Sequence, residues 1–157
     1  MKSLKYFLFI LTFSISAIFS YAQVKSVITK VQKFKPPAVK TFLGINQNGA
    51  SVTQEEASQA ITLPLKITDD KNNLYTIDSY QFLYRKKGVV QNEETGKTQV
   101  TFTIQADRFS TTPLPKIWFD NLKNSFQKDE QLHFFDIVVK DKEGRRFFAP
   151  ELKITIK

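Results

Sequence analysis

The chain of 157 residues contains no cysteine, a single histidine and only five glycines. Without cysteine it has no disulfide, thiolate metal ligand, redox thiol or cysteine nucleophile. Its one imidazole, His133, also excludes zinc sites that need two or more histidines. The glycines are dispersed along the chain, so no glycine-rich phosphate loop is present. We therefore expect a protein without cofactors or metal, and one whose stability comes from packing alone.

The first 22 residues have the layout of a secretory signal peptide. Lys2 and Lys5 precede an apolar run over residues 7–19, and small residues lead to a cleavage site after Ala22. An uncleaved anchor is the alternative, because residues 6–22 reach the lower limit of what can span a bilayer. The sequence thus predicts an exported protein, periplasmic or extracellular, with no transmembrane segment after residues 1–22 are removed.

Export would leave residues 23–157, with 21 basic and 15 acidic side chains and a net charge of +6. A domain of that size buries roughly two thirds of its unfolded surface, which is enough for a hydrophobic core. Residues 23–37 end in a double proline, so we expect an N-terminal arm or linker there. The domain itself is then predicted over residues 38–157.

Turn and helix signals come early in this predicted domain. Asn48-Gly49 is a strong turn dipeptide, and Thr53 stands three residues before Glu56, as in a capping box. This spacing predicts a short capped helical turn. A longer helix, of about three turns, is predicted over residues 116–126, because Trp118, Leu122 and Phe126 form one apolar stripe. Thr112 and the prolines that follow it suit the start of that helix.

Most other segments alternate apolar and polar residues with a period of two, as strands do. Residues 75–85 and 100–106 read as the two strands of a hairpin around a loop at Asn92–Lys97. Residues 132–140 are apolar almost throughout, which favours a central strand covered on both faces. After a turn at residues 141–144, the strand 152–156 is so regularly patterned that we expect it to be paired into the sheet.

Seven or eight short strands, one helix and no βαβ rhythm predict an all-β fold. The strand count and spacing favour an antiparallel immunoglobulin-like β-sandwich with one short α-helix. The Cys-Trp-Cys pattern of true immunoglobulin domains is absent, because the chain has no cysteine.

Catalytic and metal-binding patterns are weak. His133 lies within an apolar strand, and no activated nucleophile accompanies it, so a structural role is the better interpretation. Pairs of carboxylates at residues 55–56, 69–70 and 93–94 lie in predicted turns and loops, where solvated charge explains them. The segment Asp69–Asn73 superficially suggests calcium, yet it lacks the glycine and final glutamate of a hand-type loop. We expect no catalytic, cofactor-binding or metal-binding residues.

Basic side chains form two groups that could bind a partner. They are Arg85, Lys86 and Lys87 after an aromatic strand, and Arg145 and Arg146 after a hairpin turn. If both groups lie at one end of the sandwich, they form a positive patch beside aromatic surface. A nucleic-acid partner is excluded by export. An acidic protein, acidic polysaccharide or anionic lipid remains open, and so does a purely solubilising role.

Three stretches resemble the C-terminal periplasmic module of the GldM family of gliding-motility proteins. These are residues 77–88 (IDSYQFLYRKKG), 119–157 and, more faintly, 36–65. The shared features include an Ile-x-Ser-aromatic strand entry at Ile77, an aromatic-Asp-Ile strand at Phe135 and a Glu-Gly-x-Arg turn at Glu143. Where the family tends to have glycine, this chain has Lys128, Asp129 and Glu130.

The GldM family belongs to the motor of the type IX secretion system of Bacteroidetes, and this resemblance implies an immunoglobulin-like interaction module with no catalytic residues. From it and the signal peptide we expect an exported, non-enzymatic protein-interaction or structural module of the cell envelope. We expect an envelope protein as partner, and the sequence leaves both its identity and the oligomeric state open. A small exported carboxylate-dependent hydrolase, or a glycan-binding protein, is the alternative.

Overall fold

The computed structural model describes residues 33–157. A boundary between Lys35 and Pro36 sets the compact domain Pro36–Lys157 apart from the residues before it. The predicted signal peptide, residues 1–22, and residues 23–32 of the predicted arm lie outside the described residues. Strands account for 49% and helices for 11% of the described structure, so the domain is all-β as predicted.

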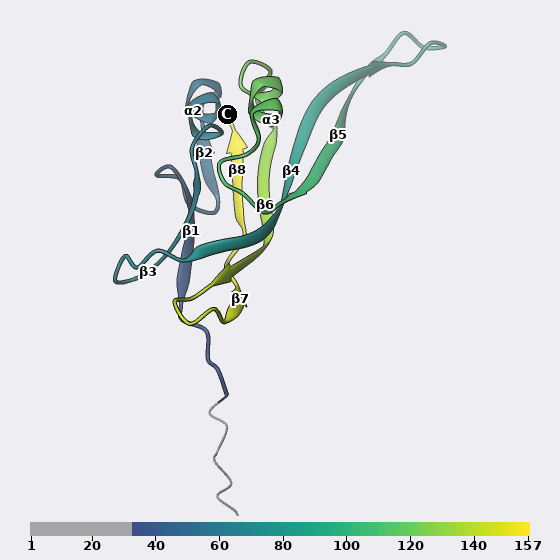
Figure 1. The fold of residues 1–157 in the computed structure, drawn as a ribbon. Helices are drawn as coiled ribbons and strands as arrows, with labels where there is room; N and C mark the ends of the chain where they lie inside the picture. Colours follow the sequence, from purple (N-terminus) through teal and green to yellow (C-terminus); the bar gives the residue numbers. More distant parts are fainter. Residues whose placement is uncertain (1–32) are drawn as a thin grey trace, which may run out of the picture. The chain divides into compact units, whose positions relative to one another are not determined.

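Eight strands and two short helices follow one another in residues 33–157 (Figure 1). The elements are β1 (Val39–Leu43), β2 (Ala50–Val52), α2 (Gln54–Ala60), β3 (Leu65–Asp69), β4 (Thr76–Gln91), β5 (Thr98–Phe109), α3 (Lys116–Leu122), β6 (Gln131–Lys140), β7 (Arg146–Phe148) and β8 (Leu152–Ile156). The second helix corrects the expectation of a single one.

The strands form a sheet of six and a separate pair. The larger sheet has the order β2-β8-β6-β4-β5, and β7 pairs with the far half of β6. β1 and β3 form the two-stranded antiparallel sheet. The expectation of purely antiparallel pairing is wrong at one place, because β2 runs parallel to β8. No local signal could show that pairing, since its two strands lie about a hundred residues apart in the sequence.

The core lies on one face of the larger sheet. Tyr80, Phe82 and Tyr84 of β4 are fully buried, and α3 adds Trp118, whose ring meets that of Phe82 edge-on at 5.6 Å. Ser58 of α2 donates a hydrogen bond to the backbone oxygen of Lys123, just after α3. The alternating side chains of β4 therefore pack under the helices, as the period of two requires.

Thr53 caps α2 as the sequence predicted. Its hydroxyl accepts from the backbone N–H of Glu56 at 3.2 Å, and the Glu56 carboxylate accepts from the backbone N–H of Thr53 at 2.7 Å. This reciprocal pair satisfies two backbone donors that a helix start otherwise leaves open. The Asn48-Gly49 turn is likewise present, with Gly49 at a φ of 82°.

Helix α3 is shorter than predicted, because it ends at Leu122 rather than near residue 126. The Ser125 hydroxyl donates to the backbone oxygens of Asn121 and Leu122 and so completes the helix end. Phe126 still reaches the core, where its ring meets Tyr84 edge-on at 5.7 Å. Thr112 does not cap the helix; its hydroxyl accepts from the backbone N–H of Leu65 at 2.7 Å and so bridges to β3.

Strand β6 is central but is buried on one face only, which corrects the expectation of cover on both faces. Asp136 has a φ of 47°, and the register against β4 shifts at this point, so it forms a bulge. Before the bulge the buried residues are Leu132 and Phe134; after it they are Ile137 and Val139. The bulge therefore moves the buried positions of β6 from even to odd numbers.

The two predicted hairpins and the closing strand are present. β4 pairs with β5 without a register shift, and β6 pairs with β7 around the turn at residues 141–144. β8 pairs with both β6 and β2, so the last strand is held within the sheet as expected.

Candidate interaction surface

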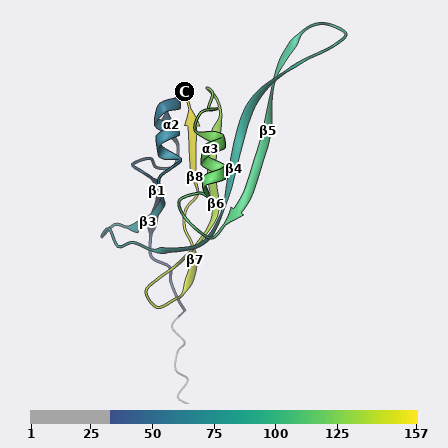
Figure 2. The same cartoon turned by 45° about the horizontal axis from the view of Figure 1, so that its top comes forward.

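The β4–β5 hairpin extends past the rest of the sheet. β4 has a partner in β6 only up to Arg85, while its pairing with β5 continues to Gln91. We call residues 86–103 the arm; it is a different segment from the predicted N-terminal arm at residues 23–37. In Figures 1 and 2 the arm projects away from the remaining strands of the domain. The arm is therefore a two-stranded ribbon with no third strand beside it.

Branched apolar side chains are exposed on this hairpin. Val89 is 65% exposed, Val90 57% and Val100 52%, and Ile104 at the base of the arm is 65% exposed. Val89 and Val90 are successive residues of a strand, so they point to opposite faces. Both faces of the arm thus present apolar groups to solvent, which is typical of surfaces that contact another molecule.

Strand β5 is also a free edge of the six-stranded sheet, because it pairs only with β4. Long edge strands usually carry lysine, proline or a bulge that discourages pairing with another chain. From Thr98 to Ala106 β5 has no charged residue and no proline, and its register is unbroken. Its backbone edge is therefore open to strand addition.

A groove of about 480 Å³ lies between α3 and β5. Ile104 and Ala106 line it from the strand, and Ile117 and Trp118 line it from the helix. Ile117 is 69% exposed, so the apolar surface of the hairpin continues onto the first turn of α3.

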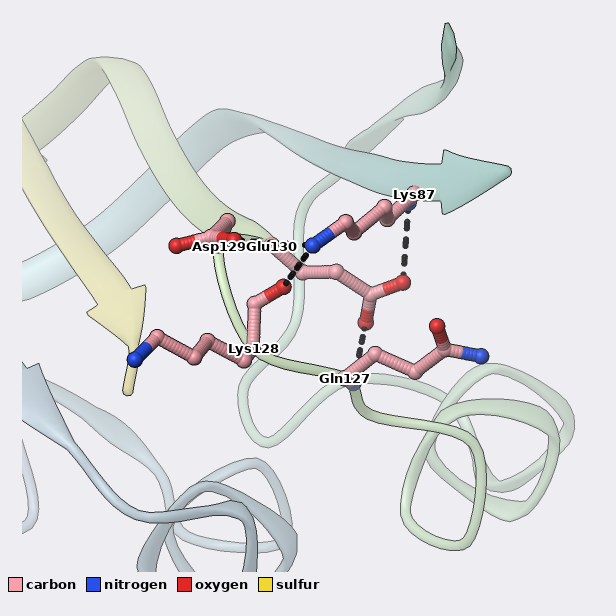
Figure 3. A network of polar contacts seen from close by, with 5 residues as sticks. All are labelled: Lys87, Gln127, Lys128, Asp129 and Glu130. Atoms are coloured by element: carbon pink, nitrogen blue, oxygen red, sulfur yellow. Dashed lines mark hydrogen bonds and ion pairs between the residues drawn. The ribbon is translucent and has the colours of Figure 1, made fainter. Parts of the chain in front are cut away.

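A buried carboxylate holds the base of the arm (Figure 3). Glu130 is completely buried and accepts from the backbone N–H of Lys87 at 2.9 Å and that of Gln127 at 2.7 Å. The hydroxyl of Tyr84 donates to the same carboxylate at 2.5 Å. Burial, reinforced by the hydrogen bond to Glu130, raises the pKa of Tyr84 well above its usual range. These bonds fix β4, at Tyr84 and at Lys87 in the base of the arm, to the segment just before β6.

The first predicted basic group lies at this base. The Arg85 guanidinium stacks over the Phe102 ring, with 3.5 Å from its carbon to the ring centre. Lys87 forms an ion pair with Asp129 at 2.8 Å. Lys86 is half-buried and has no ion pair within residues 33–157. The charge available to a partner here comes from Arg85 and Lys86.

The second group is neutralised by local carboxylates. Arg145 pairs with Asp141 at 2.7 Å and with Glu143, while Arg146 pairs with Asp78 at 2.9 Å. Lys140 and Arg146 share the Asp78 carboxylate. The hydrogen bond from Lys140 is the main reason why the pKa of Asp78 lies below its usual value. Exposed pairs of this kind contribute little to stability.

The two basic groups do not form one patch. Arg85 is opposite Gln131 at the start of β6, and Arg146 is opposite Lys140 at its end. Nine residues of extended strand span roughly 30 Å, several times the distance over which exposed charges interact at physiological salt. The condition for a single positive patch, that both groups lie at one end of the fold, is therefore not met, because the length of β6 separates them.

The remaining sequence candidates have structural partners. His133 forms a 2.9 Å contact with Glu151, and its ring packs at 4.9 Å from that of Phe135. The Asp69 carboxylate accepts from the backbone of Lys71 and Asn73, and the hydrogen bonds from Asn73 lower its pKa. Within residues 33–157, no three acidic or histidine side chains gather in a way that could hold a metal ion.

In the same range, no helix has both the length and the apolar character needed to cross a membrane.

No family model matches the chain, and no curated protein matches it either.

The arm, the free edge and the buried carboxylate of Glu130 were not predicted from the sequence. The signal for the edge was present, because residues 98–106 are uncharged and free of proline and have high strand propensity. The length by which β4 and β5 exceed β6 was not visible, since it depends on a register between distant segments.

Proposed function

We propose that this chain is an exported, non-enzymatic protein-interaction or structural module of the cell envelope. The observation that supports it best is the arm, which exposes branched apolar side chains and an unprotected strand edge outside the core. The rigid attachment of the arm through Glu130 supports the same proposal. Binding elements are commonly held in this way by a rigid scaffold.

The resemblance to the GldM family extends this proposal to gliding motility or type IX secretion. The two sheets would then be a divergent immunoglobulin-like sandwich, with the β1–β3 pair as the smaller layer. Support comes from Leu43, Leu65 and Ile67, which are almost fully buried in that pair. Further support comes from Asp129, whose φ of 76° is a conformation that favours glycine. It lies in the stretch, Lys128 to Glu130, where the family tends to have a glycine.

Export is tested by the intact mass of the protein in envelope fractions. We expect a species corresponding to residues 23–157, since the predicted cleavage site follows Ala22. Recovery of the uncleaved chain in the membrane pellet would contradict the export proposal.

Partner binding is tested by shortening the arm. Replacing residues 89–100 with Asn-Gly joins Gly88 to Thr101, a hydrogen-bonded pair, by a two-residue turn and removes the exposed valines. We expect the melting temperature to stay close to that of the parent, because these residues lie outside the core, and the co-purifying envelope protein to be lost. The matched control is Lys142→Ala in the exposed β6–β7 turn, which should retain the partner. Unchanged capture by the shortened chain, or turnover of glycan or ester substrates by the parent, would contradict the proposal.

A further inference from the structure

The alternation of hydrogen bonds shows which residues of β5 face its free side. The backbone N–H of Asn92 donates to the Lys97 oxygen at 2.9 Å, so this pair is of the hydrogen-bonded type. Such pairs alternate with non-bonded pairs along an antiparallel ladder, and the β4–β5 register has no shift. The odd-numbered residues of β5 therefore bond to β4, and the even-numbered residues, from Thr98 to Ala106, direct their N–H and C=O groups outward.

The composition of β5 is symmetric about Phe102. Val100 and Ile104 lie two residues before and after it, and Gln99 and Gln105 lie three residues away on either side. At five residues the pair is Lys97 and Asp107, whose charges are opposite. A strand with this pattern is largely complementary to itself when it is reversed. From Lys97 to Asp107, each residue then meets one of its own kind or of opposite charge, except that Thr98 meets Ala106.

We propose that a second copy of this chain pairs with β5 through an antiparallel β5–β5 contact whose two-fold axis passes beside Phe102. The contact would be isologous, as in most protein dimers, and would join two six-stranded sheets into one continuous sheet. Five bonded residue pairs would form about ten new backbone hydrogen bonds. No other element of the domain lies along the free side of β5 in either view (Figures 1 and 2).

Charge and side-chain pairing select this register. With Phe102 opposite its own copy, Val100 is opposite Ile104 and Lys97 is opposite Asp107 of the second chain, twice in each dimer. A register centred on Ile104 instead places Val100 opposite Arg108 and leaves Lys97 without a partner on β5. Opposite charges directly across a strand pair stabilise it, and like charges destabilise it.

This inference rests on the proposed function only in taking the arm as an interaction element. It is tested on the purified chain alone, so a chain that stays monomeric would not contradict the proposed binding to an envelope partner. A failure to capture an envelope partner would equally leave self-association in place.

The first experiment exchanges the two charges. Light scattering and sedimentation should give the parent a mass that rises from monomer to dimer with concentration. Lys97→Asp alone and Asp107→Lys alone each place two like-charged pairs in the homodimer, so the dissociation constant should rise about tenfold or more. An equimolar mixture of the two variants forms a heterodimer in which both pairs are again of opposite charge, and association should return. Melting temperatures serve as the folding control. A parent that stays monomeric, or variants that associate like the parent, would overturn the proposal.

The second experiment uses the absence of cysteine. Phe102→Cys introduces a single thiol at the two-fold axis, where bonded partners have Cα atoms about 5.5 Å apart, within reach of a disulfide. Val100→Cys is the matched control, since its own copy would lie roughly 14 Å away. Under mild oxidation, we expect a covalent dimer from the first variant and little from the second. Equal cross-linking of both, or faster cross-linking at residue 100, would overturn the register.

Discussion

The Tyr84 hydroxyl donates a 2.5 Å hydrogen bond to the buried Glu130 carboxylate, which links the middle of β4 to the residue before β6. A hydrogen bond to a charged group contributes about 1.5–3 kcal/mol to stability. Tyr84→Phe removes this donor and leaves the ring packing in place, so we expect a loss of that size in the free energy of unfolding. Chemical denaturation measures it.

Glu130→Gln should be at least as damaging as Tyr84→Phe. Three donors converge on the carboxylate, and an amide would present its own N–H groups to one side of that cluster. The control is Lys87→Met, which removes the exposed ion pair with Asp129 but keeps the backbone donor, and should cost less than about 1 kcal/mol. A loss from Lys87→Met equal to that from Glu130→Gln would mean that the ion pair, rather than the buried network, holds the arm.

Stability should fall in alkaline solution because of two buried tyrosines. Burial raises the pKa of Tyr80 to about 12, and burial together with Glu130 raises that of Tyr84 further. In the unfolded chain both ionise near their ordinary value of about 10. The folded state therefore holds more protons above that pH, and stability that is complete below pH 10 is lost progressively as pH rises through 12.

Denaturation curves at pH 8, 10 and 11 test this loss. The double variant Tyr80→Phe with Tyr84→Phe should start less stable and show a shallower decline, because the remaining slope comes from other groups. If the parent and the double variant decline in parallel, these two hydroxyls do not carry the pH dependence.

Local signals in the sequence predicted the elements well, while contacts between distant segments could not be predicted. The capping box of Thr53 and the turn at Gly49 each depend on a few neighbouring residues, and both are present. The apolar run at residues 132–140 predicted a strand covered on both faces, but it is buried on one face. The bulge at Asp136 is the reason, because a single extra residue reverses which side chains are buried. The separation of Arg85 from Arg146 likewise follows from pairing with β6, which neither local sequence reveals.

The two apolar residues of α3, Trp118 and Leu122, should contribute unequally to stability. Leu122 is 2% exposed, so Leu122→Ala should cost about 2–5 kcal/mol. Trp118 is only half-buried and lines the groove, although its ring meets Phe82 and Phe109 edge-on. The loss of stability from Trp118→Ala should therefore be smaller than the roughly 3–5 kcal/mol typical of a fully buried tryptophan. Thermal melts compare the two variants. A Trp118→Ala variant that melts like the parent would show that α3 does not cover the core.

The cap of α2 gives a smaller and separate effect. Thr53→Ala removes the hydroxyl that accepts from the Glu56 backbone, and the loss of such a cap costs about 1 kcal/mol. Thr53→Asn keeps an acceptor at this position and should retain most of the stability. Equal melting temperatures for the alanine variant and the parent would contradict a stabilising cap.

The last prediction concerns the two basic groups, which the length of β6 keeps apart. Lys86 has no ion pair within residues 33–157 and lies at the base of the arm, so its charge is available to an acidic partner. Arg145 is held by Asp141 and Glu143, and its charge is already balanced. We expect Lys86→Glu to weaken capture of the envelope partner and to reduce its salt dependence, with little change in melting temperature.

Arg145→Glu is the matched reversal at the other group. It would bring three carboxylates together in one turn, so we expect a lower melting temperature but nearly normal capture. Capture is measured at low salt and near 0.15 M, where attraction between exposed charges is screened beyond about 8 Å. If Arg145→Glu weakens capture as much as Lys86→Glu while the protein melts like the parent, the second group also belongs to the binding surface. The partner would then have to contact both ends of β6, because a charge at one end is screened from the other.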